Sequence, residues 1–354
     1  MKVAILVKEF PPNVIGGTET QTKRMARELA RADHNVTVYT KAYPDTPDDS
    51  TLPYDVVRVP NWRISPFIST LTFVFAATLL LIRDADDYAL LQCMMIYPNG
   101  FVGQVVNRVR GLPYFAWIRG GDYYFMKDTP GKRWSIDRVL RDTLVLVQTE
   151  RIARDVRTEF SETTLEVLGN GVDIPEGTAD GDKLVFVGRL KEQKGVHVLL
   201  HALEGHDEEL LVVGDGPERE RLEALANRLN VNAEFVGEVD PDDVADYLRE
   251  GKAFVLPSIR GEGLPNAVLE AMAIGLPVVV TDTGGVADAV IDSETGFVVD
   301  PDDVDALEQS ISRLTNYPKM RIRMGDAARE WVIKNHSWQN IVGNLETVYR
   351  CVAE

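Results

Sequence analysis

The chain has 354 residues, of which 45% are hydrophobic, so it is long enough for two domains that each bury a core. Acidic residues outnumber basic residues by 55 to 38, and the net charge of −17 argues against nucleic acid as a partner and against charge-driven binding to anionic lipid. The two cysteines, Cys93 and Cys351, are far apart in sequence, so they predict neither a disulfide framework nor a zinc site.

The chain opens directly on a predicted strand, KVAILV, without the basic region and cleavage site of a signal peptide. With two separated cysteines, this start predicts a protein of the reducing cytoplasm. Apolar runs then alternate with amphipathic stretches, which is typical of parallel sheets covered by helices on both faces. In the first half, strands are predicted at 2–7, 35–40, 54–59, 88–93, 113–118, 143–148 and 165–168.

Gly16 and Gly17 lie between the first predicted strand and a predicted helix over residues 18–32. A tight turn between a strand and a helix uses such glycines, and so does a backbone that approaches a ligand closely. The sequence leaves both uses open.

Residues 64–82 form an apolar stretch without a formal charge, bounded by Arg63 and Arg83. The stretch is at the lower limit of transmembrane length, is diluted by serine and threonine, and lies between predicted strands, so a membrane span there would disrupt the sheet. We expect a helix that packs on the sheet and stays partly exposed. The alternative is an interfacial helix that contacts a membrane surface.

The segment PEGTADGDK, residues 175–183, is acidic and rich in turn-forming residues, and it is predicted to link two domains that span 1–174 and 183–336. In the second half, strands are predicted near 184–187, 209–213, 233–236, 252–256, 277–281 and 297–299. A last helix is predicted over about 337–354. The fold class predicted by this alternation is α/β, with two Rossmann-like, doubly wound domains.

The most informative stretch is FVLPSIRGEGLPNAVLEAMAIGLPVVVTDTGG, residues 254–285. An apolar strand leads into a loop that carries Glu262, and a helix with Pro265 at its first position carries Glu270 in its second turn before Gly275 stops it. Free N–H groups at such a helix start attract phosphate. Glu270 is placed to accept hydrogen bonds from two ribose hydroxyls, and Glu262 to reach a sugar beyond the phosphates. This layout predicts a nucleotide-sugar site.

The setting EGLPNAVLEAMAIGLPVVVTDTGG resembles the signature of retaining glycosyltransferases of the GT-B fold, family 4. The opening unit from KVAILV to GGTE, LGNGVD at 168–173, FVGRLKEQKGVHVLLHAL at 186–203 and LLVVGDGPERERLEALA at 210–226 are similar to family motifs in the family's order. The resemblance implies two Rossmann-like domains facing a central cleft, an N-terminal acceptor-side domain, a C-terminal donor domain and a terminal helix that packs back on the first domain.

The resemblance also implies roles for single residues. Glu262 and the cations Arg189 and Lys194, which would hold the diphosphate, are the expected catalytic groups. The other expected donor contacts lie at the ends of the strands, on Gly16, Gly17, Gly263, Leu264, Pro265, Asn266, Glu270, Gly284 and Gly285.

Residues 118–125, IRGGDYYF, depart from the many family members that carry a histidine at the end of the corresponding strand. Here Arg119 and Asp122 occupy the region on the acceptor side. Asp122 either orients or deprotonates an acceptor hydroxyl, or forms a structural ion pair with Arg119. Tyr123 and Tyr124 either stack on an acceptor or belong to the core.

The expected activity is transfer of a hexose from a UDP- or GDP-activated donor to an acceptor, and the resemblance implies that the transfer retains configuration. The apolar segment favours a lipid-linked saccharide as acceptor and a peripheral position on the inner face of the cell membrane. No cofactor and no metal ion are expected, because Asp84 and Asp86, which have metal-binding spacing, lie in an acidic linker. The alternatives are a nucleotide-sugar epimerase or hydrolase of the same fold, and a non-catalytic protein that binds nucleotide sugars.

Overall fold

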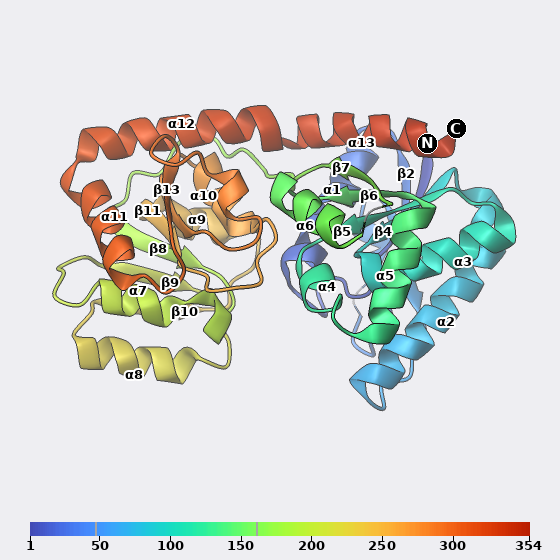
Figure 1. The fold of residues 1–354 in the computed structure, drawn as a ribbon, viewed down its shortest axis with the longest axis horizontal. Helices are drawn as coiled ribbons and strands as arrows, with labels where there is room; N and C mark the ends of the chain where they lie inside the picture. Colours follow the sequence, from blue (N-terminus) through green and yellow to red (C-terminus); the bar gives the residue numbers. More distant parts are fainter. Residues whose placement is uncertain (47, 161) are drawn as a thin grey trace. The chain divides into compact units, whose positions relative to one another are not determined.

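The structure is a computed structural model that describes residues 1–46, 48–160 and 162–354. It divides into two compact units, Met1–Gly171 with Trp338–Glu354, and Val172–Ser337. Each unit holds one parallel sheet covered by helices (Figure 1). The predicted class, two doubly wound α/β domains, is confirmed.

The N-terminal unit has a sheet of 7 strands in the order β3-β2-β1-β4-β5-β6-β7. The strands are β1 Lys2–Leu6, β2 Asn35–Lys41, β3 Asp55–Val59, β4 Leu90–Met94, β5 Tyr114–Ile118, β6 Leu144–Val147 and β7 Thr164–Val167. The helices of this unit are α1 Gly17–Arg31, α2 Pro66–Asp84, α3 Phe101–Arg110, α4 Gly121–Tyr124, α5 Pro130–Asp142, α6 Glu150–Glu159 and α13 Trp338–Ala353. Each predicted strand overlaps an observed one.

Strand β1 shows why this sheet is buried on both faces. Side chains alternate along a strand, and here Val3 and Ile5 enter the core under α1 and α13, while Ala4 and Leu6 enter the core under α2, α3, α5 and α6. An uninterrupted apolar run is therefore the expected sequence of such a strand. Helix α13 is tied to the sheet where the Tyr349 hydroxyl donates to Gln92 Oε1 at 2.7 Å.

The C-terminal unit has a sheet of 6 strands in the order β10-β9-β8-β11-β12-β13. The strands are β8 Lys183–Val187, β9 Leu210–Val213, β10 Ala233–Gly237, β11 Gly251–Leu256, β12 Val278–Thr281 and β13 Gly296–Val299. The helices are α7 Val196–Ala202, α8 Arg219–Leu229, α9 Val244–Arg249, α10 Asn266–Ala273, α11 Val304–Asn316 and α12 Pro318–His336.

The strand order reverses between β1 and β4 in the first sheet and between β8 and β11 in the second. Ligands of open parallel sheets bind beyond the carboxyl ends of the strands at such a reversal. The loops that follow β1, β8 and β11 are therefore the expected ligand-binding loops.

Residues 175–183, predicted as a linker, belong to the C-terminal unit. The Ala179 N–H donates to the Ile274 carbonyl at 2.8 Å, and the Arg329 guanidinium donates to the Pro175 carbonyl at 2.8 Å. A polar, glycine-containing segment looks like a linker in sequence, but its backbone groups here find partners on one unit. The division of the chain falls earlier, between Gly171 and Val172.

Helix α2 lies beside α3 in Figure 1 and buries one face, with Phe73, Ala77 and Leu81, in the core of the N-terminal unit. Within the described residues, Pro66–Asp87 is the one helical segment long and apolar enough to cross a membrane, and only 22% of its most apolar window is buried. Most of this apolar segment therefore faces away from the core.

Candidate active site

The loops at the strand reversal of the C-terminal unit are packed backbone against backbone. Gly195, with φ +67°, follows β8, and a Cβ atom there would collide with the carbonyl oxygen of Pro257 after β11. Gly284, with φ +53°, follows β12, and a Cβ atom there would collide with the carbonyl oxygen of Glu262. These glycines hold the loops after three strands against one another.

This packing brings Lys194 and Glu262 together. Lys194 Nζ lies 2.6 Å from Glu262 Oε1, and the Ser258 hydroxyl donates to the same oxygen at 2.8 Å. The side chain of Thr281, at the end of β12, donates to the Ser258 carbonyl. Glu262 is buried, at 8% exposure, and the ion pair and the Ser258 hydrogen bond hold its carboxylate in one place.

Arg189, the other predicted cation, stands in the same loop after β8. Its side chain is exposed, and within the described residues it has no hydrogen-bond or ion-pair partner. The loop beneath it is fixed, because the Leu190 N–H donates to the Asp215 carbonyl at 2.8 Å. The site therefore offers one cation held by a carboxylate and one that is free to bind an anion.

Helix α10 starts one residue later than predicted. Pro265, expected at the first helical position, has an extended ψ of 128° and caps the helix, and Asn266 is the first helical residue. The N-cap residue and the first helical residue both leave the backbone N–H without a partner in the helix. Proline therefore suits both positions, and the sequence does not show which one it occupies. Asn266 and Glu270 are four residues apart on the same helix face. Gly275, with φ +85°, follows the helix as predicted.

The remaining predicted donor contacts surround the Glu262 loop. The Gly285 N–H donates to the Glu262 carbonyl at 3.3 Å. Gly263 is half-buried, and the Leu264 side chain is buried in the core. Leu264 is thus an anchor of the loop, which leaves its neighbours nearer to the surface.

In the N-terminal unit, Gly16 caps the 15-residue helix α1, and Gly17 is its first residue. Gly16 has an extended φ of −160°, which any residue adopts, so its backbone conformation does not require glycine. A Cβ atom would instead collide with Oε2 of Glu19. The carboxylate of Glu19 therefore lies over the start of α1.

Arg119 and Asp122 follow β5 and are both buried, at 8% and 6% exposure. Asp122 Oδ1 accepts the backbone N–H of Arg119 at 2.8 Å, and Oδ2 accepts the backbone N–H of Ile96 at 2.7 Å. Burial raises the pKa of Asp122 to about 6, although these hydrogen bonds and the Arg119 charge lower it. Of the two predicted roles, the structural one is favoured, but through the Arg119 backbone and not through its guanidinium.

The two tyrosines predicted on the acceptor side are largely internal. Tyr123 is completely buried, which does not fit contact with an acceptor. Tyr124 is half-buried, and its hydroxyl donates to Asp155 Oδ2 at 2.6 Å. The sequence of an aromatic pair after a strand fits both acceptor stacking and core packing. Here both tyrosines pack in or against the core of the N-terminal unit.

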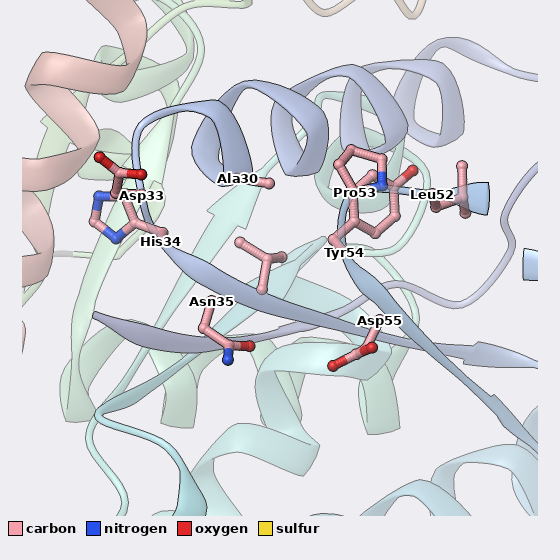
Figure 2. A pocket seen from close by; sticks show the side chains of 9 residues that line it. Ala30, Asp33, His34, Asn35, Leu52, Pro53, Tyr54 and Asp55 are labelled. Atoms are coloured by element: carbon pink, nitrogen blue, oxygen red, sulfur yellow. The ribbon is translucent and has the colours of Figure 1, made fainter. Parts of the chain in front are cut away.

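Figure 2 shows a pocket of about 500 Å³ in the N-terminal unit, which sequence did not predict. Its lining includes Asn35 and Asp55, the first residues of β2 and β3, and Ala30 near the end of α1. The pocket thus lies at the amino edge of the sheet, whereas ligands of such sheets bind at the carboxyl edge. We therefore place the candidate site in the loops described above.

Family models match almost the whole chain. A model described as "Glycosyl transferases group 1" matches residues 175–331, and one described as "Glycosyltransferase Family 4" matches residues 15–176. The chain belongs to glycosyltransferase family 4. The glycosyltransferase is 27% identical to an uncharacterized glycosyltransferase of Methanocaldococcus jannaschii, over 100% of the chain and 99% of the relative.

The glycosyltransferase is also 27% identical to the GDP-mannose-dependent alpha-(1-6)-phosphatidylinositol monomannoside mannosyltransferase of Mycolicibacterium smegmatis, over 95% of the chain and 94% of the relative. Among solved structures it is similar to the sucrose-phosphate synthase of Thermosynechococcus elongatus, with a TM-score of 0.86, 23% identity and coverage of 99% and 98%. Anabaena HepE, solved in complex with UDP, gives a TM-score of 0.82 with 17% identity and coverage of 99% and 100%. These structures establish the GT-B fold.

Two residues of the site were not predicted. No sequence pattern near Ser258 predicts a role in the site, because its hydrogen bond to Glu262 depends on how the loop folds. Glu19 could have been predicted from its position: it is the third residue of α1, where an acidic side chain can reach back to the free N–H groups of the helix start.

Proposed function

We propose that the glycosyltransferase moves a hexose from a UDP- or GDP-activated sugar to an acceptor, without a metal ion and with retention of configuration. The observation that carries the donor site is the Lys194–Glu262 ion pair at the strand reversal of the C-terminal unit, with the exposed Arg189 in the same loop as Lys194. Retention rests on the family resemblance alone.

The proposed chemistry follows from the charges. Breaking the bond between the anomeric carbon and the diphosphate leaves negative charge on the phosphate while the sugar becomes more cationic. Arg189 and Lys194 would stabilise the phosphate, and Glu262 would hold the sugar. Glu270, on the face of α10 that also carries Asn266, would accept the ribose hydroxyls. Positioned cations would take the place that a metal ion has in other transferases.

Relatives and neighbours support a nucleotide-sugar donor. Two mannosyltransferases among the relatives are described as GDP-mannose-dependent, and Anabaena HepE was solved with UDP-glucose. The two nucleotides differ, so both stay in the proposal.

The proposal predicts turnover in the presence of EDTA. A panel of UDP- and GDP-sugars is incubated with the full chain and membrane lipid extract, and release of the nucleoside diphosphate is followed. We expect release from one donor that depends on the extract and survives chelation, because the phosphate charge is met by side chains. Loss of activity that manganese or magnesium restores would contradict metal independence, and release without any acceptor would indicate a hydrolase.

We further propose that the acceptor is lipid-linked and that the protein sits peripherally on the inner face of the cell membrane. Helix α2 carries an exposed apolar stripe, formed by Phe67, Leu71, Phe75 and Leu79 at four-residue spacing. Phe67 is 76% and Phe75 66% exposed, although the opposite face of the helix is buried in the core. Such exposure of large apolar side chains indicates an interaction surface.

A lipid surface suits this stripe better than a second protein. The stripe is about 18 Å long and about one helix, or 10 Å, wide, whereas a stable protein interface buries about 800 Å² on each partner. An interfacial helix needs only an apolar face of this kind. Between Arg63 and Arg83 the segment has no charged residue, and the two arginines suit headgroups at its ends.

The stripe predicts binding to neutral vesicles. Because the net charge of −17 opposes anionic lipid, phosphatidylcholine vesicles are the cleaner probe. We expect the full chain to co-sediment with them, and the double variant Phe67→Ser, Phe75→Ser to stay in solution with an unchanged melting temperature. The matched control is Ile322→Ser, which removes a 61% exposed apolar side chain from α12. Equal sedimentation of the double variant and the wild type would contradict the proposal.

A further inference from the structure

Ser258, which follows β11, is held in place by the backbone on both sides of it. The residue is completely buried, at 0% exposure. Before it, Pro257 packs against Gly195, where a Cβ atom would collide with the Pro257 carbonyl oxygen. After it, the Ile259 N–H donates to the Gln193 carbonyl at 2.8 Å. The backbone of Ser258 is therefore fixed against the loop that follows β8.

The side chain of Ser258 reaches the carboxylate of the donor site. Its hydroxyl donates to Glu262 Oε1 at 2.8 Å, and Lys194 Nζ lies 2.6 Å from the same oxygen. The Thr281 side chain donates to the Ser258 carbonyl, which ties the residue to the end of β12 as well. Among the described residues, none donates a hydrogen bond to Oε2 of Glu262. Oε1 thus has a neutral and a charged partner, and Oε2 is available to a ligand.

The two partners of Oε1 differ in how far they can move. Lys194 carries its charge on a long side chain that is 20% exposed, and the proposed function assigns this charge to the donor diphosphate. Ser258 carries its hydroxyl one bond away from a fixed backbone, so it cannot follow Lys194. When Lys194 turns to the diphosphate, the Ser258 hydrogen bond stays on the Glu262 carboxylate. Hydrogen bonds to an ionised carboxylate are among the stronger ones in proteins.

We propose that Ser258 is a positioning residue of the transfer reaction. It keeps the Glu262 carboxylate directed at the donor sugar while Lys194 passes from Glu262 to the diphosphate. Without the hydroxyl, the carboxylate can rotate about its side-chain bonds once Lys194 leaves, and fewer bound donors reach the productive geometry. This role rests on the proposed glycosyl transfer and adds to it a residue that touches no substrate.

The first test measures turnover and nucleotide affinity separately. We expect Ser258→Ala to lower kcat about tenfold or more, the effect of losing one hydrogen bond to a charged group, and to leave the calorimetric affinity for free UDP or GDP unchanged. The matched control is Ser310→Ala in α11, because Ser310 is also buried and its hydroxyl also donates at 2.8 Å, to the Ala306 carbonyl. The control should keep the wild-type kcat, and a melting temperature for each variant reports folding.

The second test is a double-mutant cycle with Glu262→Ala. If Ser258 acts through Glu262, Ser258→Ala should lower kcat in the wild type and cause no further loss in the Glu262→Ala background. An equal loss in both backgrounds, as a merely structural serine would cause, overturns the proposal. Ser258→Cys keeps the shape of the side chain with a weaker donor, so its kcat should lie between those of the wild type and Ser258→Ala.

This third variant keeps the proposal testable if Ser258→Ala does not fold, and a wild-type kcat for Ser258→Cys would also overturn it. The outcomes separate the two proposals. Absence of transfer by the wild type would refute the proposed function together with this role. Transfer by the wild type with an undiminished rate in Ser258→Ala would refute only the role of Ser258.

Discussion

Lys194→Ala is expected to lower kcat by about 100- to 1,000-fold, the range for loss of one group that stabilises developing charge. Lys194 lies in the loop after β8 and reaches Glu262 across the strand reversal. Its charge would meet the phosphate only as the donor bond breaks, so its loss should affect turnover more than ground-state binding. Initial rates at saturating donor measure the effect.

Lys191→Ala is the matched control, because Lys191 stands in the same loop and its side chain has no partner among the described residues. It should retain wild-type kcat to within about twofold, since Lys191 is half-buried without an ion-pair partner and lies outside the proposed diphosphate contacts. A melting temperature for each variant separates loss of function from loss of fold, because Lys194→Ala leaves the buried Glu262 carboxylate without its cation. Lys194→Ala with a rate near that of wild type would contradict the diphosphate role.

The two glutamates are expected to fail in different ways. Glu270→Ala should weaken affinity for free UDP or GDP about 10- to 100-fold, because a carboxylate that accepts hydrogen bonds contributes about 1.5–3 kcal/mol. Glu262→Ala should lower kcat about 100-fold or more while nucleotide affinity stays the same or rises. The rise is expected because Lys194, released from the ion pair, is then free to meet the diphosphate.

Strand positions could be predicted from sequence because both faces of each sheet are buried. Val3, Ala4, Ile5 and Leu6 each contact a core, so the strand is an unbroken apolar run whatever lies above or below it. The strand order, with its reversal between β8 and β11, was not predicted and comes from the structure. Because the carboxyl ends of parallel strands share one edge of a sheet, the predicted strands did place Lys194 and Glu262 at the same edge.

Contacts between loops could not be predicted in the same way. Lys194 and Glu262 were assigned to different groups of the donor, and their ion pair depends on Gly195 packing against Pro257. The aromatic composition around Tyr123 suited both core and ligand, and only tertiary packing buried it. The sequence also did not show which residues of α2 would be exposed, since an apolar helix face has the same composition whether it packs on a sheet or contacts a membrane.

We propose that the carboxyl edge of the C-terminal sheet binds the nucleotide of the donor. Calorimetric titration of the wild type, Glu262→Ala and Glu270→Ala with UDP and with GDP measures this binding without turnover. We expect one nucleotide to bind the wild type and Glu262→Ala with similar affinity, or Glu262→Ala more tightly, and to bind Glu270→Ala at least about tenfold more weakly. Loss of nucleotide binding in Glu262→Ala, with Glu270→Ala unaffected, would contradict it.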